Sequence, residues 1–267
     1  MRIAIKGAGD LASGIALRLY KARFNVAMSE LALPTTIRTA VSFSRALTEG
    51  EANVEGVNAK LAKNAAEAAA LIKQGLIAVL VDPDAASLLK LKPDVLVDAI
   101  LAKANLGTRL SDAPVVIGVG PGFSAGVDCH AVVETRRGHT LGRVITDGSA
   151  LKNTGEPGEI GGYSLERLLK APAAGVFTKA ASIGEVLEAG EAAGYVGEIP
   201  MRAKIRGVLR GILPSGIPVY EGMKCGDIDP RPYTEHCFTV SDKALAIGGG
   251  VLEAILRFTP KNKLDLR

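Results

Sequence analysis

The feature that most constrains the fold of this chain is a short apolar segment, residues 2–6, that leads directly into a glycine turn and a helical pattern. The turn reads GAGDLA and fits the pattern G-x-G-x-x-A. In such a turn the first glycine allows a sharp bend, the second lets a pyrophosphate approach the backbone, and the alanine lets helix and strand pack closely. Free amides at the helix start also favour an anion. We therefore predict a nucleotide-binding strand, turn and helix, with cofactor contacts from Gly7, Gly9, Asp10, Ala12 and Ser13.

Two acidic residues bear on this prediction. Glu30 stands at the end of the second expected strand, where dinucleotide-binding proteins place the acid that takes the ribose hydroxyls. Asp10 sits at the helix start, where a phosphate would bind, and it fits a helix cap as well as a metal or ligand contact. A tight turn that binds nothing remains the alternative for the whole loop.

The pattern along the first half of the chain predicts the fold class. Short apolar runs alternate with alanine-rich helical stretches, which is typical of strands joined by crossover helices. The expected strands are residues 2–6, 24–30, 76–82, 94–100, 114–120 and 130–135. The expected helices are residues 10–22, 35–47, 63–74 and 85–91, with a hairpin at 49–61. We therefore predict an α/β fold whose residues 1–168 form a Rossmann-like, doubly wound parallel sheet.

Beyond about residue 167 the chain is dense in proline and glycine and repeats itself. A shift of 32 residues superposes Ala171 on Ala203, Gly175 on Gly207, Val176 on Val208, Gly184 on Gly216, Gly190 on Gly222 and Gly194 on Gly226. Neither half can bury an apolar face alone, so we predict that residues 169–232 close into a small all-β barrel-sandwich. This region resembles the biotinyl and lipoyl carrier fold, but its central hairpin, residues 197–202, holds no lysine. Residues 233–267 are expected to pack back on the main domain.

Further candidate residues follow the later strands. The loop at residues 118–126 is a second glycine-rich turn, and its amides suit either an anion-binding nest or simple turning. We expect Gly118, Gly120 and Gly122 to contact the cofactor. After the fourth strand come Asp98, Lys103, Asn105, Thr108 and Arg109, which suit phosphate, pterin or carboxamide recognition unless they form a solvated loop. Asp98 and Lys103 are the candidates for catalysis. Thr35, Thr36 and Arg38 form another phosphate-facing candidate, which a helix cap explains equally well.

Composition and charge exclude several functions. The chain carries 32 Lys and Arg against 28 Asp and Glu, spread out along the sequence, so nucleic acid is not an expected partner. Three widely spaced cysteines, Cys129, Cys225 and Cys237, argue for a reducing compartment. We expect no signal peptide and no membrane span, and read the protein as cytoplasmic. His130 and His236 each adjoin a cysteine, but adjacent strand residues point to opposite faces, so no metal site is expected.

Six separated blocks together resemble a known family. They are KGAGDLASG from Lys6, DVLVDAILAKANLG from Asp94, residues 118–126, GHTLGR from Gly138, NTGEPGEIGG from Asn153 and HCFTVSDKALAIGGGVLE from His236. These blocks are similar to the YqeB-type proteins of selenium-dependent molybdenum hydroxylase systems, relatives of the XdhC accessory proteins. XdhC proteins carry a Rossmann-like domain and load or sulfurate the molybdopterin cofactor. The resemblance implies that Gly7, Gly9, Asp10 and the loop at 118–126 line a cofactor crevice.

Three functional hypotheses follow. The first is an accessory protein for molybdenum hydroxylase maturation that binds molybdopterin or its cytosine dinucleotide. Its partner would be the molybdenum hydroxylase apo-enzyme, and the small barrel would dock that enzyme or cover the cofactor. The second is an NAD-dependent oxidoreductase with Glu30 on the ribose and Asp98 or Lys103 near the reacting carbon. The third is a nucleotide-sensing module without chemistry. A homo-oligomer is compatible with each of them.

Overall fold

The computed structural model describes residues 1–152, 155, 157–260 and 262. It divides into two compact units, which are described separately. Unit 1 comprises residues 1–32, 42–154 and 240–267, and unit 2 comprises residues 33–41 and 155–239. The sequence placed domain boundaries near residues 168 and 232. The block that begins at Asn153 contains Asn153, Thr154 and Glu156, which lie outside the described residues.

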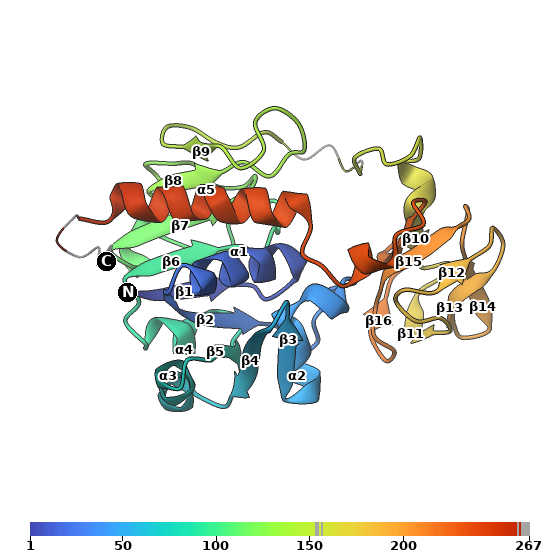
Figure 1. The fold of residues 1–267 in the computed structure, drawn as a ribbon, viewed down its shortest axis with the longest axis horizontal. Helices are drawn as coiled ribbons and strands as arrows, with labels where there is room; N and C mark the ends of the chain where they lie inside the picture. The colour runs from blue at the N-terminus through green and yellow to red at the C-terminus, as the bar shows by residue number, and fades with distance from the viewer. Residues whose placement is uncertain (153–154, 156, 261, 263–267) are drawn as a thin grey trace. The chain divides into compact units, whose positions relative to one another are not determined.

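Unit 1 is built on a nine-stranded sheet with the order β3-β4-β5-β2-β1-β6-β7-β8-β9 (Figure 1). The strands are β1 (Arg2–Lys6), β2 (Asn25–Glu30), β3 (Glu51–Val54), β4 (Val57–Ala62), β5 (Ile77–Val81), β6 (Val95–Asp98), β7 (Val115–Val119), β8 (Ala131–Val133) and β9 (Val144–Ile145). From β4 to β8 neighbouring strands run parallel. Because β1 is central, the glycine turn that follows it lies in the middle of one sheet edge.

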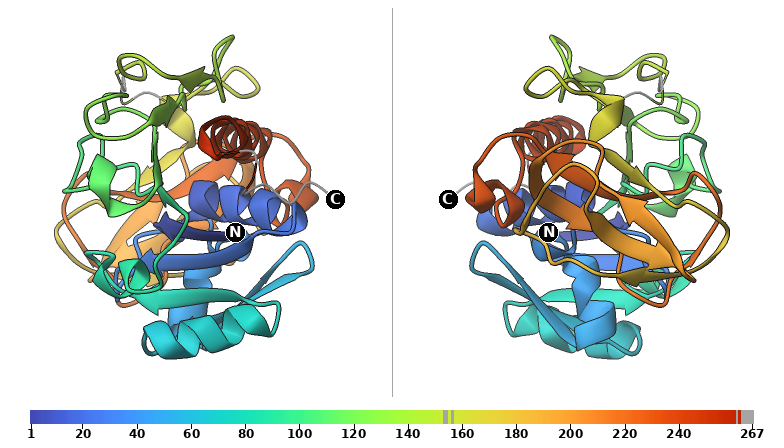
Figure 2. Two further views of the ribbon diagram at one scale, coloured as in Figure 1. Left: turned by 90° about the vertical axis from the view of Figure 1, so that its left-hand side faces the viewer. Right: turned by 90° about the vertical axis from the view of Figure 1, so that its right-hand side faces the viewer.

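Each face of this sheet is covered by helices. Side chains alternate between faces along a strand. On one face Ala4, Ala27 and Leu96 pack in a core with Ala68 and Ile72 of α3 (Ala65–Lys73) and Leu88 of α4 (Ala86–Leu89). Helices α1 (Asp10–Lys21) and α5 (Asp242–Phe258) lie side by side in unit 1 (Figures 1 and 2), and α1 contacts β1 and β2.

The predicted Rossmann-like, doubly wound parallel sheet is wrong. The sheet is mixed, because the hairpin of β3 and β4 joins one edge and β9 runs antiparallel to β8 at the other. Two crossovers also lack the helices that a doubly wound sheet requires: the 99–114 connection holds only the 3₁₀ turn η3 (Leu110–Asp112), and residues 120–130 form a loop. Residues 35–47, expected as a helix, form the 3₁₀ turns η1 (Thr39–Val41) and η2 (Phe43–Arg45) and the start of α2 (Ala46–Glu49). Without regular crossover helices the sheet is not doubly wound.

Unit 2 consists of two four-stranded antiparallel sheets, with the orders β10-β17-β15-β12 and β14-β13-β11-β16. Its strands are β10 (Leu168–Lys170), β11 (Gly175–Lys179), β12 (Val186–Leu187), β13 (Ala192–Val196), β14 (Ile199–Arg202), β15 (Gly207–Ile212), β16 (Pro218–Val219) and β17 (Lys224–Asp229). A shift of 32 residues relates β11 to β15, β12 to β16 and β13 to β17. Phe177, Leu209 and Ile228 lie in one buried core that draws on both sheets.

The predicted barrel-sandwich domain at residues 169–232 is therefore corrected to this pair of sheets. Unit 2 also takes in residues 33–41, which the sequence pattern had assigned to the main domain, because the Ile212 N–H donates to the Ile37 carbonyl at 2.8 Å. The segment after β17 forms the 3₁₀ turn η5 (Thr234–Cys237) before α5 begins. No helix among the described residues is both long and apolar enough to cross a membrane.

Candidate functional site

Three polar side chains form a row across the carboxyl ends of the central strands. Lys6 of β1 is in register with Ser29 of β2 on one side and with Asp98 of β6 on the other. Register partners in a sheet place their side chains on the same face. The face that carries this row is otherwise apolar, since Ala4, Ala27 and Leu96 precede the three polar residues on the same strands.

The row is buried and charged. Lys6 is 6% exposed and Asp98 is fully buried. The Lys6 Nζ lies 3.7 Å from the Asp98 Oδ2 and donates to the Leu106 carbonyl at 3.4 Å. The Thr108 hydroxyl donates to the same Asp98 oxygen at 2.5 Å. Because burying a charge is costly unless it is paired, Asp98 and Thr108 explain how Lys6 is accommodated.

This row is not fully satisfied. An ammonium group has three N–H donors, and the contacts of Lys6 among the described residues are one long hydrogen bond and one ion pair at the outer limit of distance. The Ser29 hydroxyl oxygen is buried and has no hydrogen-bond partner within the described residues. Buried polar groups are normally paired, so exceptions next to one another call for an explanation.

The glycine turn follows β1 directly. Gly7 has φ +106°, and a Cβ there would stand 3.0 Å from the Ala99 carbonyl oxygen, so both the conformation and the close approach require glycine. The Ala8 N–H donates to the Glu30 Oε2 at 2.9 Å, and the Leu31 N–H donates to the Oε1 at 2.9 Å. Glu30 therefore holds the turn in place, and its predicted contact with a ribose stays a prediction.

The start of α1 also differs in detail from the sequence pattern. Gly9, not Asp10, is the N-cap residue, so Asp10 occupies the first turn of the helix. Ala12 is 1% exposed and packs inside the unit. The Ser13 hydroxyl donates to the Ala8 carbonyl at 3.1 Å and accepts from the Phe43 N–H at 2.8 Å. Ser13 therefore ties the turn to η2, and anion binding by the first backbone N–H groups of α1 stays a prediction.

The second glycine loop lies against the segment that follows Asp98. A Cβ at Gly122 would stand 2.7 Å from the Ala104 Cα, and one at Gly120 would stand 2.9 Å from the Thr135 hydroxyl. Gly118 leaves room for the Phe123 ring. Asn105 donates to the Asp128 carboxylate at 3.1 Å, which joins the two loops. Residues 99–108 thus touch both glycine loops.

The structure therefore brings together Gly7, Asp98, Thr108 and the second glycine loop at one sheet edge. Lys103, the second candidate for catalysis, is exposed and has φ +65°. Sequence reasoning missed Lys6 and Ser29. A signal for Lys6 was available in the sequence, because this lysine is the last residue of an apolar strand and stands immediately before the glycine turn. Such a position is buried when the strand is central in its sheet.

The cysteines and histidines form no comparable site. Burial raises the pKa of the Cys129 thiol to about 11, and burial likewise raises the pKa values of Cys225 and Cys237. The His130 Nδ1 accepts from the Val116 N–H at 3.0 Å, so it serves the sheet. Across the part of the chain that the structure describes, no three His, Cys, Asp or Glu side chains gather as a metal site would require.

These features define an α/β protein with a mixed sheet and a buried lysine beside two glycine loops. No protein-family model matches the chain. Over 254 residues, 95% of its length, the chain is 52% identical to "Uncharacterized protein YqeB" of Escherichia coli K12, which confirms the resemblance to YqeB. The match covers 47% of that protein, so the chain spans about half the length of its curated relative.

Two of the solved structures that match the chain, both weakly, carry aspartoacylase names. One is an aspartoacylase family protein from Mesorhizobium loti, with a TM-score of 0.28 and 13% identity. The other is a succinylglutamate desuccinylase/aspartoacylase from Rhodobacter sphaeroides, with a TM-score of 0.29 and 14% identity. Each comparison covers 86% of this chain and 85% of the other. At these scores no activity is carried over.

Proposed function

We propose that this chain binds a phosphate-bearing cofactor at the carboxyl ends of β1, β2 and β6, and that it does so as an accessory protein in molybdenum hydroxylase maturation. The observation that carries the binding site is the buried ammonium group of Lys6, which lies directly before the glycine turn and has donors to spare. The role in maturation rests on the sequence resemblance and on nothing in the site itself.

A phosphate group suits this edge for two reasons. The first-turn N–H groups of α1 offer uncharged donors at the positive end of a helix, whereas the N–H groups of Gly7 and Ala8 in the glycine turn are already donated to Ser29 and Glu30. Lys6 adds a full positive charge in a setting of low dielectric, where a charge-assisted hydrogen bond is strong. Ser29 supplies a further hydroxyl whose oxygen is buried and unpartnered within the described residues.

A molybdopterin-type ligand is favoured over NAD by the state of Glu30. In an NAD site the carboxylate at this position accepts from the ribose hydroxyls. Here both oxygens of Glu30 accept backbone N–H groups, from Ala8 and Leu31. Molybdopterin itself carries a phosphate group and no ribose, so it makes no demand on this carboxylate, whereas its cytosine dinucleotide carries a ribose as NAD does.

The test is binding by the full chain and by Lys6→Met, which keeps the length of the side chain and removes its charge. Molybdopterin cytosine dinucleotide released from a molybdenum hydroxylase, and NAD as the competing ligand, would each be titrated under anaerobic conditions with calorimetry as the readout. We expect Lys6→Met to bind the dinucleotide about ten- to a hundredfold more weakly, the loss of a charge-assisted contact.

The matched control is Lys60→Met, because Lys60 is half-exposed on β4 and pairs with Glu51 at 3.8 Å. It should bind like the unmodified chain. Tight NAD binding without pterin binding would overturn the proposed ligand. Equal affinity in Lys6→Met and the unmodified chain would overturn the site.

A further inference from the structure

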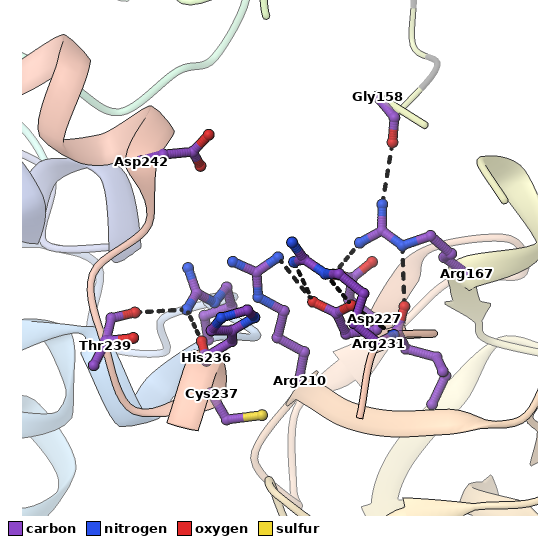
Figure 3. A network of polar contacts seen from close by, with 12 residues as sticks. Gly158, Arg167, Arg210, Asp227, Arg231, His236, Cys237, Thr239 and Asp242 are labelled. Atoms are coloured by element: carbon purple, nitrogen blue, oxygen red, sulfur yellow. Dashed lines mark hydrogen bonds and ion pairs between the residues drawn. The ribbon is translucent and has the colours of Figure 1, made fainter. Parts of the chain in front are cut away.

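Unit 2 contains a second concentration of charge, which the proposed function does not use. We call it the arginine cluster, and its members are Arg38, Arg167, Arg210, Arg231, Asp227, Asp229 and His236 (Figure 3). Arg210 lies on β15, and both aspartates lie on β17, the neighbouring strand. The cluster is therefore fixed to the framework of one sheet.

The two aspartates are already well satisfied. Arg231 donates to both oxygens of Asp229, at 2.9 and 2.7 Å. The Arg231 N–H also donates to the Asp229 Oδ1 at 3.1 Å. Arg167 donates to Asp227 at 2.9 Å and to the carbonyls of Ile228 and Gly158, each at 3.1 Å. These pairs have the geometry of structural ion pairs and need no further partner.

Arg210 differs from its neighbours. Its side chain is 12% exposed, and its contact within the cluster is a 3.5 Å ion pair with the Asp229 oxygen that Arg231 already holds. Its Nε is buried and has no hydrogen-bond partner among the described residues. A guanidinium group has five N–H donors, and the Nε–H donor of Arg210 is thus both buried and unused among the described residues.

A second unused group stands beside it. The Nδ1 atom of His236 is buried and has no hydrogen-bond partner within the same described part of the chain. Figure 3 draws the His236 ring next to the Arg210 side chain. Burial raises the pKa of the neighbouring Cys237 thiol, and the charges of Arg210 and Arg38 counter that rise. The Arg38 guanidinium donates to the His236 carbonyl of η5 at 3.1 Å.

We propose that the arginine cluster is a phosphate-binding site in unit 2, with Arg210 as its principal ligand. A planar guanidinium presents paired N–H donors that match two oxygens of a phosphate group, and Arg is less strongly hydrated than Lys, so it is the usual residue for a buried anion contact. The bidentate Arg231–Asp229 pair holds Asp229 in place, and that carboxylate lies 3.5 Å from a terminal nitrogen of Arg210. The Nδ1 atom of His236 supplies a further polar contact.

The ligand is a phosphate group, carried either as the free ion or on a small phosphate ester. The experiment separates these sources by titrating the full chain with inorganic phosphate and with phenyl phosphate, using calorimetry and thermal unfolding. Sodium chloride and succinate at the same ionic strength are the reference anions. We expect a rise in Tm and measurable binding with a phosphate compound, and neither with chloride or succinate. Tighter binding of phenyl phosphate assigns an ester as the source, and tighter binding of inorganic phosphate assigns the free ion.

Variants locate the binding. Arg210→Met should weaken phosphate binding at least tenfold, because the principal ligand is removed. Arg206→Met is the matched control, since Arg206 precedes the same strand but is exposed and paired with Glu188 at 2.7 Å; it should bind as the unmodified chain does. Arg210→Lys keeps the positive charge but not the planar guanidinium group, so its phosphate affinity should fall between those of the unmodified chain and Arg210→Met. This variant keeps the test decisive if Arg210→Met does not fold.

Three results would overturn this proposal. The first is an equal Tm in phosphate and in chloride, and the second is unchanged phosphate affinity in both Arg210 variants. The third is loss of phosphate binding in Lys6→Met with full binding in Arg210→Met, which would move the anion to the sheet edge of unit 1. Because the two sites use different residues, failure of the arginine cluster leaves the dinucleotide test of the proposed function intact.

Discussion

Gly14 of α1 lies so close to Ala244 of α5 that a Cβ atom at Gly14 would stand 2.6 Å from the Ala244 Cβ. The Val240 side chain approaches the same point at 3.0 Å, and a Cβ at Gly248 would lie 3.2 Å from the Gly14 carbonyl oxygen. The two helices therefore meet through small residues. This contact joins the helix that follows the glycine turn to the last helix of the chain.

We expect Gly14→Ala to destabilise the protein although alanine is the better helix former. The added methyl group needs space that Ala244 occupies, and overpacking of this kind costs about 1–3 kcal/mol against a gain in helix propensity of about 1 kcal/mol. Urea unfolding followed by circular dichroism measures the difference. Gly249→Ala is the control, because nothing lies within 4 Å of its Cβ position, and it should stabilise by about 0.5–1 kcal/mol. A Gly14→Ala variant as stable as the Gly249→Ala variant would contradict the close packing.

The buried row at the sheet edge gives a second prediction. Asp98→Asn removes the charge opposite Lys6, and loss of one partner from a buried ion pair costs about 3–5 kcal/mol. The Thr108 hydroxyl can still donate to the Asn side-chain oxygen, so the loss reports mainly the stranded ammonium group. Urea unfolding of Asp98→Asn, Lys6→Met and the double variant completes a thermodynamic cycle.

The double variant should be more stable than Asp98→Asn alone, because it no longer buries an unpaired charge. If adding Lys6→Met to Asp98→Asn lowers stability further by its full separate cost, the two residues are not coupled and the row is not an ion pair in solution.

Cysteine reactivity gives a third prediction. The Cys129 thiol is fully buried, and burial raises its pKa to about 11. The charge of Asp128 also raises this pKa, whereas backbone hydrogen bonds at Gly118 and Ala131 lower it. At pH 8 about one such thiol in a thousand is ionised, and the thiolate is the reactive form. Iodoacetamide at pH 8 should therefore leave Cys129 unmodified in the folded protein and label it in urea, as read by mass spectrometry of peptides. Rapid labelling of the folded chain at Cys129 would mean that this thiol is accessible and activated.

The sequence predicted individual elements better than their assembly. Strand β1 matches its expected range, and β2, β5, β6 and β7 fall within theirs, because each is a compact apolar run with a turn on either side. Residues 35–47 misled the pattern: Arg38, Ser42 and Ser44 are buried there, and three-residue 3₁₀ turns replace a helix. The hairpin predicted at residues 49–61 is present as β3 and β4, but its place at a sheet edge and the antiparallel pairing of β9 with β8 were missed, because edge pairing depends on which strands meet and local periodicity does not encode that.

In the candidate site, too, some residues were identified from the sequence and others were not. Gly7 and Asp98 were identified because glycine turns and acids after strands have local signatures. Lys6 and Ser29 were not, since their importance arises from register across β1 and β2, two strands separated by a helix. The arginine cluster was out of reach for the same reason: Arg38, Arg167 and Arg210 are far apart in the sequence and meet only when unit 2 is folded.

Asp229 gives the last prediction, on acid stability. Burial alone would raise its pKa, but the hydrogen bonds and charge of Arg231, together with the charge of Arg210, outweigh burial and hold the pKa below its ordinary value of 3.8. A carboxyl group whose pKa is lower in the folded state stabilises that state above its unfolded pKa, and this contribution disappears as the pH falls through the folded pKa. Part of the acid lability of the protein below about pH 3.8 should therefore be due to Asp229.

We expect Asp229→Asn to be less stable at pH 7 by about 1–3 kcal/mol, the cost of leaving charged hydrogen-bond partners unmatched. The deficit should shrink as the pH falls below 3.8 toward the lower pKa of the folded state, because protonation removes the charge of the aspartate over that range. Urea midpoints from pH 7 to pH 3 measure both effects. Asp84→Asn, at an exposed position, should track the unmodified chain throughout. A deficit for Asp229→Asn that stays constant with pH would show that the charge of Asp229 contributes nothing and that the substitution acts only through packing.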